Sequence, residues 1–201
     1  MTDRNAPTAH PIHPLIAGRH SPRAYTDAPV TAEQLASILE AGRWAASCFN
    51  EQPWNFVVAR RDADPEAFAT LLGLLGAFNQ VWAKDAGALV ITVARKVFTG
   101  NGNPNAVALY DVGQAAANMV LQAASMGLAS RQMRGFDVER ARVELGVPAD
   151  NDPVSAIAFG VPGDAAKILP PDVAAKEGLP RVRKPIGDFS HVGKFGTSFT
   201  G

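Results

Sequence analysis

The sequence predicts a single globular domain that combines α-helices with β-strands. Its 201 residues suit one domain and are enough to bury a sizeable core. Hydrophobic residues make up 47% of the chain and charged residues 19%, which are ordinary proportions for a globular protein. Segments with apolar residues at helical spacing alternate with short apolar runs that are typical of buried strands. No repeat or linker interrupts residues 13–201, so we expect one domain there, preceded by a mobile N-terminal arm at residues 1–12.

The first two predicted helices begin at capping residues. Thr31 opens a capping-box sequence that ends at Gln34, and apolar residues follow it at helical spacing. Asp64 stands at the expected cap of the second helix, with Pro65 at the first helical position. These local signals predict where both helices start.

The longest predicted helix spans residues 109–126. Its apolar residues form one stripe, and Gly127 suits its C-terminal cap. Its many alanines indicate that another helix packs very close to it. A further capped helix is predicted at residues 137–145, and it ends at Gly146.

Three short apolar runs predict buried strands, at residues 56–59, 88–94 and 154–159. After Gly163 the regular pattern fades. From Leu179 onward the chain is rich in Pro, Gly and Arg, and it is too irregular to fold alone. Either this tail is disordered or it wraps around something, such as a second copy of the chain.

Charge and cysteine content exclude several classes of protein. Lys plus Arg number 19 and Asp plus Glu also 19, which argues against a protein built to coat nucleic acid or an anionic membrane. Cys48 is the only cysteine, so an internal disulfide and a multi-thiolate zinc site are excluded. The sequence shows no apolar run that could span a bilayer and no signal core, so we expect a cytoplasmic protein.

Several common site motifs are absent. Residues 100–104 look like a phosphate loop, but Asn105 stands where a dinucleotide-binding fingerprint needs its third glycine. The four histidines are not spaced as metal ligands on one element, so no metal is predicted. The sequence also has no nucleophile elbow.

The first candidate binding segment places two arginines around a serine. Alternate side chains of an extended segment point the same way, so Arg19, Ser21 and Arg23 are expected to converge on one anion, with His20 between them. Guanidinium and hydroxyl donors suit a phosphate. A solvated loop with surface arginines is the alternative interpretation.

The second candidate segment follows the first predicted helix. Short polar side chains such as Ser47 and Asn50 can meet the edge of a planar ligand, while Phe49 or Trp54 covers apolar surface. A flavin ring needs this mixture of donors and apolar cover. The alternative is a helix end closed by side-chain caps, with Trp54 in the core. Cys48 has no histidine nearby in sequence, so a packing role is expected rather than a nucleophilic one.

Three further segments carry groups that suit a ring or a phosphate. Asn79 lies between aromatic residues, where its amide either reads a ring edge or caps the helix ahead of it. Arg134 and Gly135 precede a capped helix, whose N–H groups favour the negative charge of a reduced flavin, although a turn that requires glycine is equally compatible. Arg181 and Arg183 offer a second guanidinium pair for a phosphate, or plain solvated charge.

Taken in chain order, these five segments resemble the nitroreductase family of FMN-dependent oxidoreductases. The match runs from about His13 to Gly196. Its most specific stretch is AASCFNEQPW at residues 45–54, which is similar to the family signature at the exit of the first long helix. The resemblance implies an α+β fold with a central, mostly antiparallel sheet flanked by helices. It also implies an intertwined homodimer with a swapped C-terminal segment and one FMN in each of two interface sites.

The resemblance also assigns the contacts to FMN. The first segment and the tail arginines would hold the phosphate, ribityl chain and ring edge, and residues of the second segment would come from the other subunit. The Asn79 amide would bond the pyrimidine end of the ring, and Arg134 and Gly135 would line its N5 side. The implied FMN-binding residues are Arg19, His20, Ser21, Arg23, Ala46, Ser47, Cys48, Asn50, Asn79, Met133, Arg134, Gly135, Arg181 and Arg183.

The implied chemistry is a ping-pong transfer of hydride. NADH or NADPH gives hydride to the flavin and leaves, and a flat conjugated acceptor such as a nitroaromatic or a quinone then enters the same pocket. The cofactor performs the difficult step and the protein supplies orientation and electrostatics, so no catalytic acid or base is assigned.

The chain departs from the family pattern in two regions. Some members carry an acidic residue where Arg134 stands and a lysine about where Trp82 stands. A cation near N5 favours the anionic reduced flavin and raises its potential. Residues 96–109 are short beside members with a long helical lid, so substrate preference is not carried over.

Three other functions are compatible with the sequence. A specialised flavoenzyme of the same fold would act on one dedicated metabolite. A flavin-binding protein would store or sense FMN without turnover. A helical interaction domain would bind no ligand.

Overall fold

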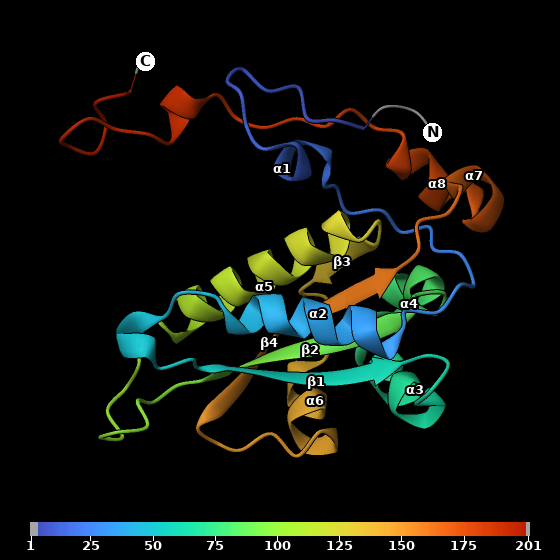
Figure 1. Cartoon of the computed structure of the whole chain (residues 1–201), viewed down its shortest axis with the longest axis horizontal. Helices are drawn as coiled ribbons and strands as arrows, with labels where there is room; N and C mark the ends of the chain where they lie inside the picture. Colours follow the sequence, from blue (N-terminus) through green and yellow to red (C-terminus); the bar gives the residue numbers. More distant parts are fainter. Residues whose placement is uncertain (1–3, 200–201) are drawn as a thin grey trace.

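A four-stranded antiparallel sheet forms the centre of the fold (Figure 1). The structure is a computed structural model, and it describes residues 4–199. The strands lie in the order β1-β2-β4-β3, and each neighbouring pair is antiparallel. The predicted α+β class with a central antiparallel sheet is therefore confirmed. The strands are β1 (Trp54–Arg60), β2 (Ala88–Arg95), β3 (Ala129–Met133) and β4 (Asn151–Gly160).

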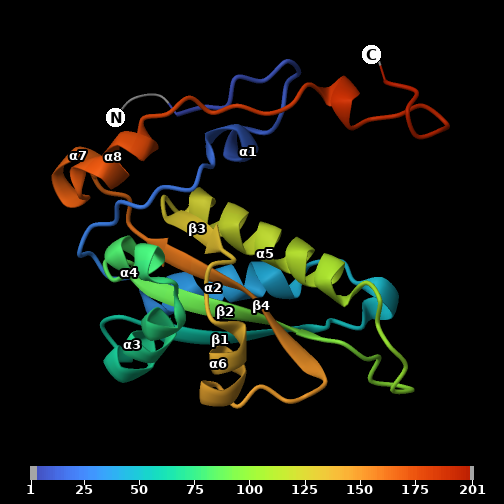
Figure 2. The same cartoon turned by 180° about the vertical axis from the view of Figure 1, so that it is seen from behind.

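Helices cover both faces of this sheet (Figure 1 and Figure 2). The longer helices are α2 (Ala32–Arg43), α3 (Pro65–Leu74), α4 (Ala77–Ala83), α5 (Ala108–Ser125) and α6 (Val138–Glu144). Helices α2 and α5 lie on one face, and α3 and α6 lie on the other. The shorter helical segments are α1 (Pro14–Gly18), η1 (Cys48–Asn50), α7 (Ala165–Ile168), α8 (Pro171–Glu177) and η2 (Ile186–Asp188).

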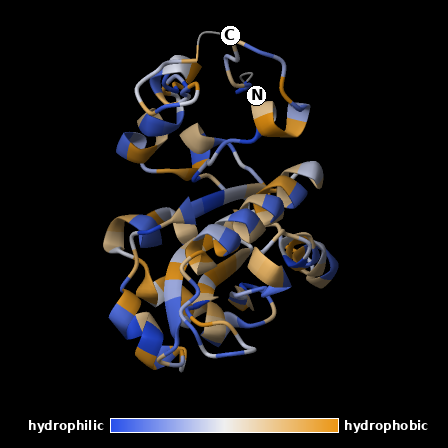
Figure 3. Cartoon of the chain, turned by 90° about the vertical axis from the view of Figure 1, so that its left-hand side faces the viewer, coloured by the Kyte–Doolittle hydropathy of each residue, from blue (hydrophilic) through white to orange (hydrophobic). Residues whose placement is uncertain are grey.

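Side chains of β2 supply the core on both sides of the sheet. Leu89, Ile91 and Val93 pack with α3 and α6, whereas Ala88 and Val90 pack with α2 and α5. We call the sheet with the helices α2 to α6 the body. Figure 3 shows hydrophobic stretches along its strands and helices. Because both faces of β2 are buried, its sequence is a continuous apolar run rather than an alternating one.

Three predicted helix boundaries are confirmed. The Thr31 hydroxyl accepts a hydrogen bond from the Gln34 N–H, and the Gln34 side chain accepts one from the Thr31 N–H. This capping box starts α2. Gly127 and Gly146 follow the ends of α5 and α6 with φ of +74° and +62°, the left-handed conformation that suits glycine.

Helix α2 packs very close to α5, as the alanines of α5 predict. The stripe residues of α5, such as Val112, Ala116 and Ala123, are buried. A Cβ atom on Gly42 of α2 would lie 2.9 Å from Cγ of Met119 on α5. A side chain at position 42 would therefore displace the Met119 side chain from its place between the two helices.

The predicted start of α3 is also confirmed: Asp64 occupies the cap position and Pro65 the first helical position, although the Asp64 side chain accepts from the Arg60 N–H at 3.4 Å and makes no capping bond. Two other predictions of local structure are wrong. The sequence predicts three strands, whereas β3 is a fourth; it lacks β-branched residues and pairs only with β4. The fading pattern after Gly163 hides α7 and α8, which are held to the core by Leu169 and Val173.

The first described residues and part of the C-terminal tail run side by side above the sheet and its helices (Figure 1). An Arg181 guanidinium N–H donates to the Arg4 carbonyl, and Arg4 Nη1 donates to the Leu179 carbonyl at 3.2 Å. Residues 1–3 of the predicted arm lie outside the described residues. The mobility of the arm and the exchange of the tail between subunits stay predictions.

Candidate functional site

Six of the predicted site residues line one pocket of about 190 Å³. These six are Arg19, His20, Ser21, Arg23, Arg181 and Arg183. The other lining residues are Arg4, Arg131, Lys176 and Glu177. Seven of the ten are Arg or Lys and one is acidic, so the pocket is suited to an anion. We call it the anion pocket.

The end of α1 positions Arg19 and Ser21 on one side of the anion pocket. Arg19 leaves the helix with extended backbone, at φ −62° and ψ 124°, and its Nη1 donates to Ser21 Oγ at 3.2 Å. Nδ1 of His20 lies 3.2 Å from the Gly18 carbonyl oxygen. Arg19 and Ser21 thus meet on the same side of the segment, as the alternation of an extended chain requires.

The two tail arginines have different roles. The Arg181 guanidinium donates to three backbone carbonyls, among them those of Ala17 at 2.7 Å and Arg19 at 2.9 Å. It therefore fastens the tail to the segment that carries Arg19. Arg183 Nη1 donates to the adjacent Val182 carbonyl at 2.8 Å. Within residues 4–199, the Arg183 guanidinium forms no ion pair with a carboxylate.

Positive charges crowd one another in the anion pocket. Burial lowers the pKa of Arg19, and the neighbouring Arg183 cation lowers it further. Burial also lowers the pKa of Arg181, and the charges of Arg19 and Arg183 add to the effect. Arginine stays protonated in spite of such shifts. The repulsion therefore disfavours the close approach of these cations, and a bound anion would relieve it.

Arg23 is engaged by a carboxylate of the same chain. Its Nη1 lies 2.6 Å from Glu177 Oε1, and its backbone N–H donates to Glu177 Oε2 at 3.1 Å. Both side chains are largely buried, with exposures of 15% and 13%. The sequence predicts that Arg23 converges with Arg19 on an external anion, but in this structure its partner is Glu177. Sequence reasoning misses the pair because Glu177 belongs to the unpredicted helix α8.

Arg131 is a pocket residue that sequence reasoning misses. It lies on β3 and donates to the Ser21 carbonyl, and its guanidinium carbon lies 5.6 Å from the centroid of the Trp82 ring. Burial lowers its pKa, followed by the charge of Arg23. A strand assigned to residues 129–133 would have drawn attention to Arg131. Side chains alternate along a strand, so Arg131 then lies on the face opposite the buried Ser130.

Asn79 and Gly135 are brought together next to the anion pocket. Asn79 Nδ2 donates to the Gly135 carbonyl at 3.0 Å. The centroid of the neighbouring Phe78 ring lies 5.6 Å from the Arg23 guanidinium carbon and 4.9 Å from Lys176 Nζ. Because Arg23 and Lys176 line the anion pocket, the hydrogen bond from Asn79 to Gly135 lies next to that pocket. Asn79 lies inside α4, so the alternative that it caps the preceding helix is wrong.

Met133 and Arg134 point to different surroundings. Met133 is buried in the core, so its side chain does not line an open site. Arg134 is exposed, and its guanidinium carbon lies 5.5 Å from the centroid of the Phe136 ring. Of the two side chains, Arg134 is the one that a ligand can reach.

The remaining predicted residues, Ala46, Ser47, Cys48 and Asn50, belong to a turn with unusual backbone. We call residues 45–52 the strained segment, because Phe49, Asn50 and Gln52 have φ of 53°, 56° and 50°. Such values are rare for residues other than glycine and cost about 1–3 kcal/mol each. Ser47 Oγ accepts a hydrogen bond from the Gln52 N–H at 3.0 Å, which stabilises the turn.

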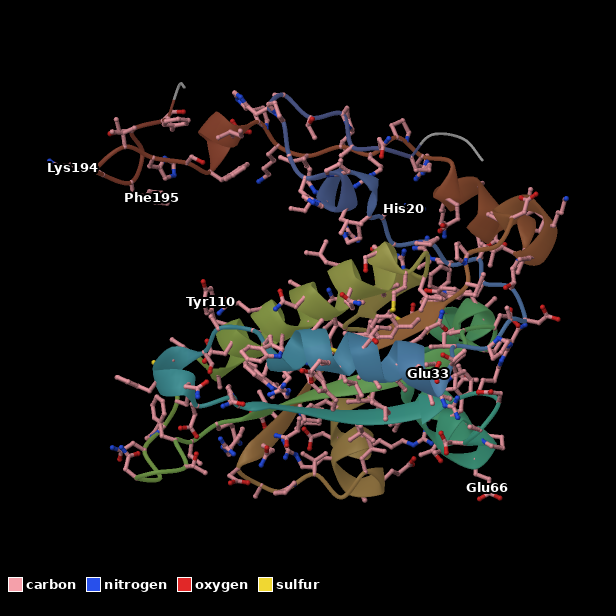
Figure 4. All side chains as sticks on the ribbon, viewed as in Figure 1. His20, Glu33, Glu66, Tyr110, Lys194 and Phe195 are labelled. Carbon is pink, nitrogen blue, oxygen red and sulfur yellow. The ribbon has the colours of Figure 1, made fainter. Side chains whose placement is uncertain are left out.

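The strained segment and the anion pocket lie at opposite ends of α5. The Cys48 N–H donates to Oδ2 of Asp111, a buried residue in the first turn of α5, at 3.1 Å. Arg19 and His20 instead line a second cavity with Ala124, in the last turn of α5. The 13 positions from Asp111 to Ala124 correspond to about 20 Å of helix. Figure 4 shows Tyr110 near one end of α5 and His20 near the other.

One chain therefore contains both sets of predicted residues but does not bring them together. Among residues 4–199, no group of His, Cys, Asp and Glu side chains could hold a metal ion. Within the same range, no helix has the length and apolar character needed to cross a membrane.

Known proteins share this fold and sequence pattern. The profile of the Nitroreductase family matches residues 16–161. A crystal structure described as an oxidoreductase containing FMN has a TM-score of 0.90 at 32% identity, and it covers 98% of this chain and 100% of its own. A second structure, from Desulfovibrio desulfuricans and in complex with FMN, has a TM-score of 0.69 at 27% identity and covers 92% of this chain and 99% of its own. A protein of Archaeoglobus fulgidus, whose name couples NADH dehydrogenase with NAD(P)H nitroreductase, is 29% identical over 154 residues, or 75% of this chain and 84% of the relative.

Proposed function

This chain belongs to the nitroreductase family, and we propose that it transfers hydride from NAD(P)H to a flat conjugated acceptor through FMN. The oxidoreductase class and the cofactors FMN and NAD(P)H follow from the family match and from the FMN-containing structures that it resembles. The acceptor class, a nitroaromatic, a quinone or a related molecule, and the ping-pong order are our proposal. A cytoplasmic location stays a prediction from the sequence.

The anion pocket fits the phosphate end of FMN. Arg19 and Ser21 present a guanidinium and a hydroxyl on the same side, and Arg183 is close enough to lower the pKa of Arg19. Two guanidiniums and a hydroxyl form charge-assisted hydrogen bonds with a phosphate dianion. This match between donor set and charge is the observation that carries the proposal.

The volume of the pocket also bears on the proposal. At about 190 Å³, it suits a phosphate and part of the ribityl chain rather than a whole FMN. Asn79, Gly135 and Arg134 lie beyond it, where we place the ring. Ser47 and Asn50 of the same chain are too far away to complete that site.

A second copy of the chain is therefore part of the proposal. Its strained segment would place Ser47 and Asn50 at the ring edge, and its own anion pocket would receive the strained segment of the first copy. Exposed apolar residues support such an assembly: Trp44 and Tyr110 near the strained segment are 73% and 70% exposed, and Phe195 in the tail is 96% exposed. Figure 4 shows Phe195 at the far end of the tail, well away from the body.

The protein contributes position and charge to the reaction. When bound, FMN supplies the chemistry that accepts hydride and passes it on. Arg19, Ser21 and Arg183 would hold its phosphate, and Asn79 would fix the orientation of the ring. The exposed Arg134 would place a cation near the ring edge. We assign no side chain as catalytic acid or base.

The first test is the flavin content of the purified protein. We expect a yellow protein with one FMN per chain and with absorbance that bleaches when NADH or NADPH is added without oxygen. A quinone should then restore the absorbance. A colourless protein that ignores added FMN contradicts the proposal, and a yellow protein that neither nucleotide bleaches supports a storage or sensing role instead.

The second test asks whether two copies share each site. A chain with Arg19→Ala and Arg183→Ala and a chain with Ser47→Ala and Asn50→Ala should each retain little FMN. Unfolded and refolded together, they form mixed dimers in which one site carries all four substitutions and the other carries none. In each mixed dimer we expect FMN to bind at one of the two sites, the one without substitutions. If each chain formed its own site, mixing would restore nothing.

A further inference from the structure

Glu51 joins the strained segment to the loop of residues 96–105. Its Oε1 accepts hydrogen bonds from Arg95 Nη2 at 2.6 Å, from the Thr99 N–H at 2.7 Å and from the Thr99 hydroxyl. The Glu51 side chain is 11% exposed, so solvent competes little for these bonds. One carboxylate thus ties together two segments that lie 48 positions apart in the sequence.

The loop of residues 96–105 is closed by its own hydrogen bonds. Val97 and Pro104 form an antiparallel bridge, and the Phe98 N–H donates to the Asn103 carbonyl at 2.8 Å. Figure 1 shows the loop beside η1, at the end of the body opposite α8. Because the loop is a small closed unit, the anchor at Thr99 sets the position of the whole loop.

The same two segments also meet through aromatic rings. The centroids of Phe49 and Phe98 are 6.2 Å apart, and the ring planes form an angle of 65°, an edge-to-face arrangement. Phe49 is 90% exposed although its backbone is strained, with φ of 53°. A large apolar side chain kept exposed at such a cost is typical of a contact surface for a ligand.

We propose that Glu51 is a positioning residue for the acceptor: its carboxylate holds the pair Phe49 and Phe98 in place as an apolar wall against which a flat acceptor packs. The inference rests on the proposed function, because Ser47 and Asn50, which flank Phe49, are placed there at the edge of the flavin. The hydrogen bonds from Thr99, followed by those from Arg95, lower the pKa of Glu51, so the anchor is ionised at neutral pH.

The test compares Glu51→Gln, Phe98→Ala and the double variant with the wild type. Glu144→Gln is the matched control, since Glu144 also pairs with an arginine, Arg140, but on α6 and away from both segments. In the holoenzyme we expect Glu51→Gln to lower kcat/KM for a benzoquinone about fivefold, the effect of one hydrogen bond of ordinary net strength. With ferricyanide, a compact acceptor that needs no apolar wall, kcat/KM should stay unchanged, as should the FMN content.

Two further readouts separate positioning from general damage. Effects of Glu51→Gln and Phe98→Ala on the benzoquinone reaction should not multiply in the double variant, because both act through the same wall. Hydrogen exchange in the protein without substrate should accelerate at residues 48–52 and 96–105 in Glu51→Gln, but not in Glu144→Gln.

The inference would be overturned if both hydrogen exchange and benzoquinone kinetics were unchanged in Glu51→Gln. It would also be overturned if the effects of Glu51→Gln and Phe98→Ala on kcat/KM multiplied in the double variant. Equal losses with benzoquinone and ferricyanide would also overturn it, because they would indicate damage to the flavin site itself. Failure of the proposed function would look different. It would show in the wild type as missing flavin or missing quinone reduction, while the exchange experiment would still report on the anchor.

Discussion

The two ends of α5 carry predicted binding residues of opposite character. At the C-terminal end, the anion pocket gathers seven cationic side chains around one carboxylate. At the N-terminal end, the strained segment has three non-glycine residues with positive φ and an exposed phenyl ring. The pocket is held in shape by hydrogen bonds between the N-terminal segment and the tail, whereas the strained segment is held by the carboxylates of Asp111 and Glu51.

We infer from this difference that the two ends contribute differently to binding. The anion pocket is a cavity whose lining carries an excess of positive charge. The strained segment lines neither of the two cavities described above, yet its backbone is held in a costly conformation. We propose that its exposed groups serve a ligand held elsewhere, a flavin in the pocket of a second copy.

The largest expected effect comes from removing the free cations of the anion pocket. Arg19→Ala with Arg183→Ala should weaken FMN binding on the order of a hundredfold or more, because each lost charge-assisted bond is worth roughly 1.5–3 kcal/mol. The measurement is a titration of the apoprotein with FMN, followed by flavin fluorescence. Arg140→Ala, which removes a cation from α6, should bind FMN as the wild type does. Normal flavin content in the double variant would contradict the placement of the phosphate.

A smaller and opposite effect is expected from Glu177→Gln. The substitution removes the only carboxylate that lines the anion pocket and frees the Arg23 guanidinium. FMN should bind about tenfold more tightly, since a repelling charge is gone, while Tm should fall because a largely buried ion pair is lost. Titration calorimetry and thermal unfolding measure the two effects.

Glu66→Gln is the matched control for this variant, because Glu66 points away from the body on α3 (Figure 4). It should change neither affinity nor Tm. Weaker FMN binding in Glu177→Gln would mean that Glu177 orients Arg23 toward the cofactor rather than competing with it.

At the other end of α5, backbone strain predicts an effect on stability. Phe49→Gly should be more stable than Phe49→Ala by about 1 kcal/mol, because glycine adopts a φ of 53° without the cost that a Cβ imposes. The phenyl ring is 90% exposed, so both variants lose little buried surface. Urea unfolding measures the difference.

Val143 on α6 supplies the control for this comparison. It is also strongly exposed, but it lies in a right-handed helix. There the order should reverse, with Val143→Gly about 1 kcal/mol less stable than Val143→Ala. If the glycine variant were less stable than the alanine variant at position 49 as well as at position 143, the backbone at Phe49 would carry no energetic cost.

The smallest expected effect concerns pH and Glu51. Because the pKa of Glu51 is lower in the folded chain than in the unfolded chain, its contribution to stability is complete above the unfolded value, near 4.3, and is lost as pH falls through the folded value. The stability difference between wild type and Glu51→Gln should therefore be constant at neutral pH and shrink in acid. Urea unfolding at several pH values checks this, and a difference that persists unchanged in strong acid would contradict it.

Sequence reasoning succeeds where the signal is local. The capping box at Thr31 and the glycines after α5 and α6 act through their immediate neighbours, so the sequence is sufficient to place them. Strand β3 and helix α8 are different. Strand β3 lacks β-branched residues and α8 has only seven residues, and they are stabilised by distant contacts with β4 and with the core through Val173.

The same limit applies to the candidate site. Arg19, Ser21 and Arg183 could be selected from the sequence because their types and spacing suit a phosphate. Arg131 and Glu177 could not, because they enter the anion pocket only through the two elements that the sequence hides. The pairing of Arg23 with Glu177 spans 154 positions, and no local pattern announces it.

In the dimer that we propose, helix α5 would set the distance between the two half-sites that each chain contributes. Inserting or deleting one residue within it would shift one end by about 1.5 Å and rotate it by roughly 100° relative to the other. In a symmetric pair that error would appear twice, once at each cofactor, with no rotation of the subunits able to correct both. A change of length along α5 would therefore disturb both proposed sites, because the number of its turns fixes the spacing between the anion pocket and the strained segment.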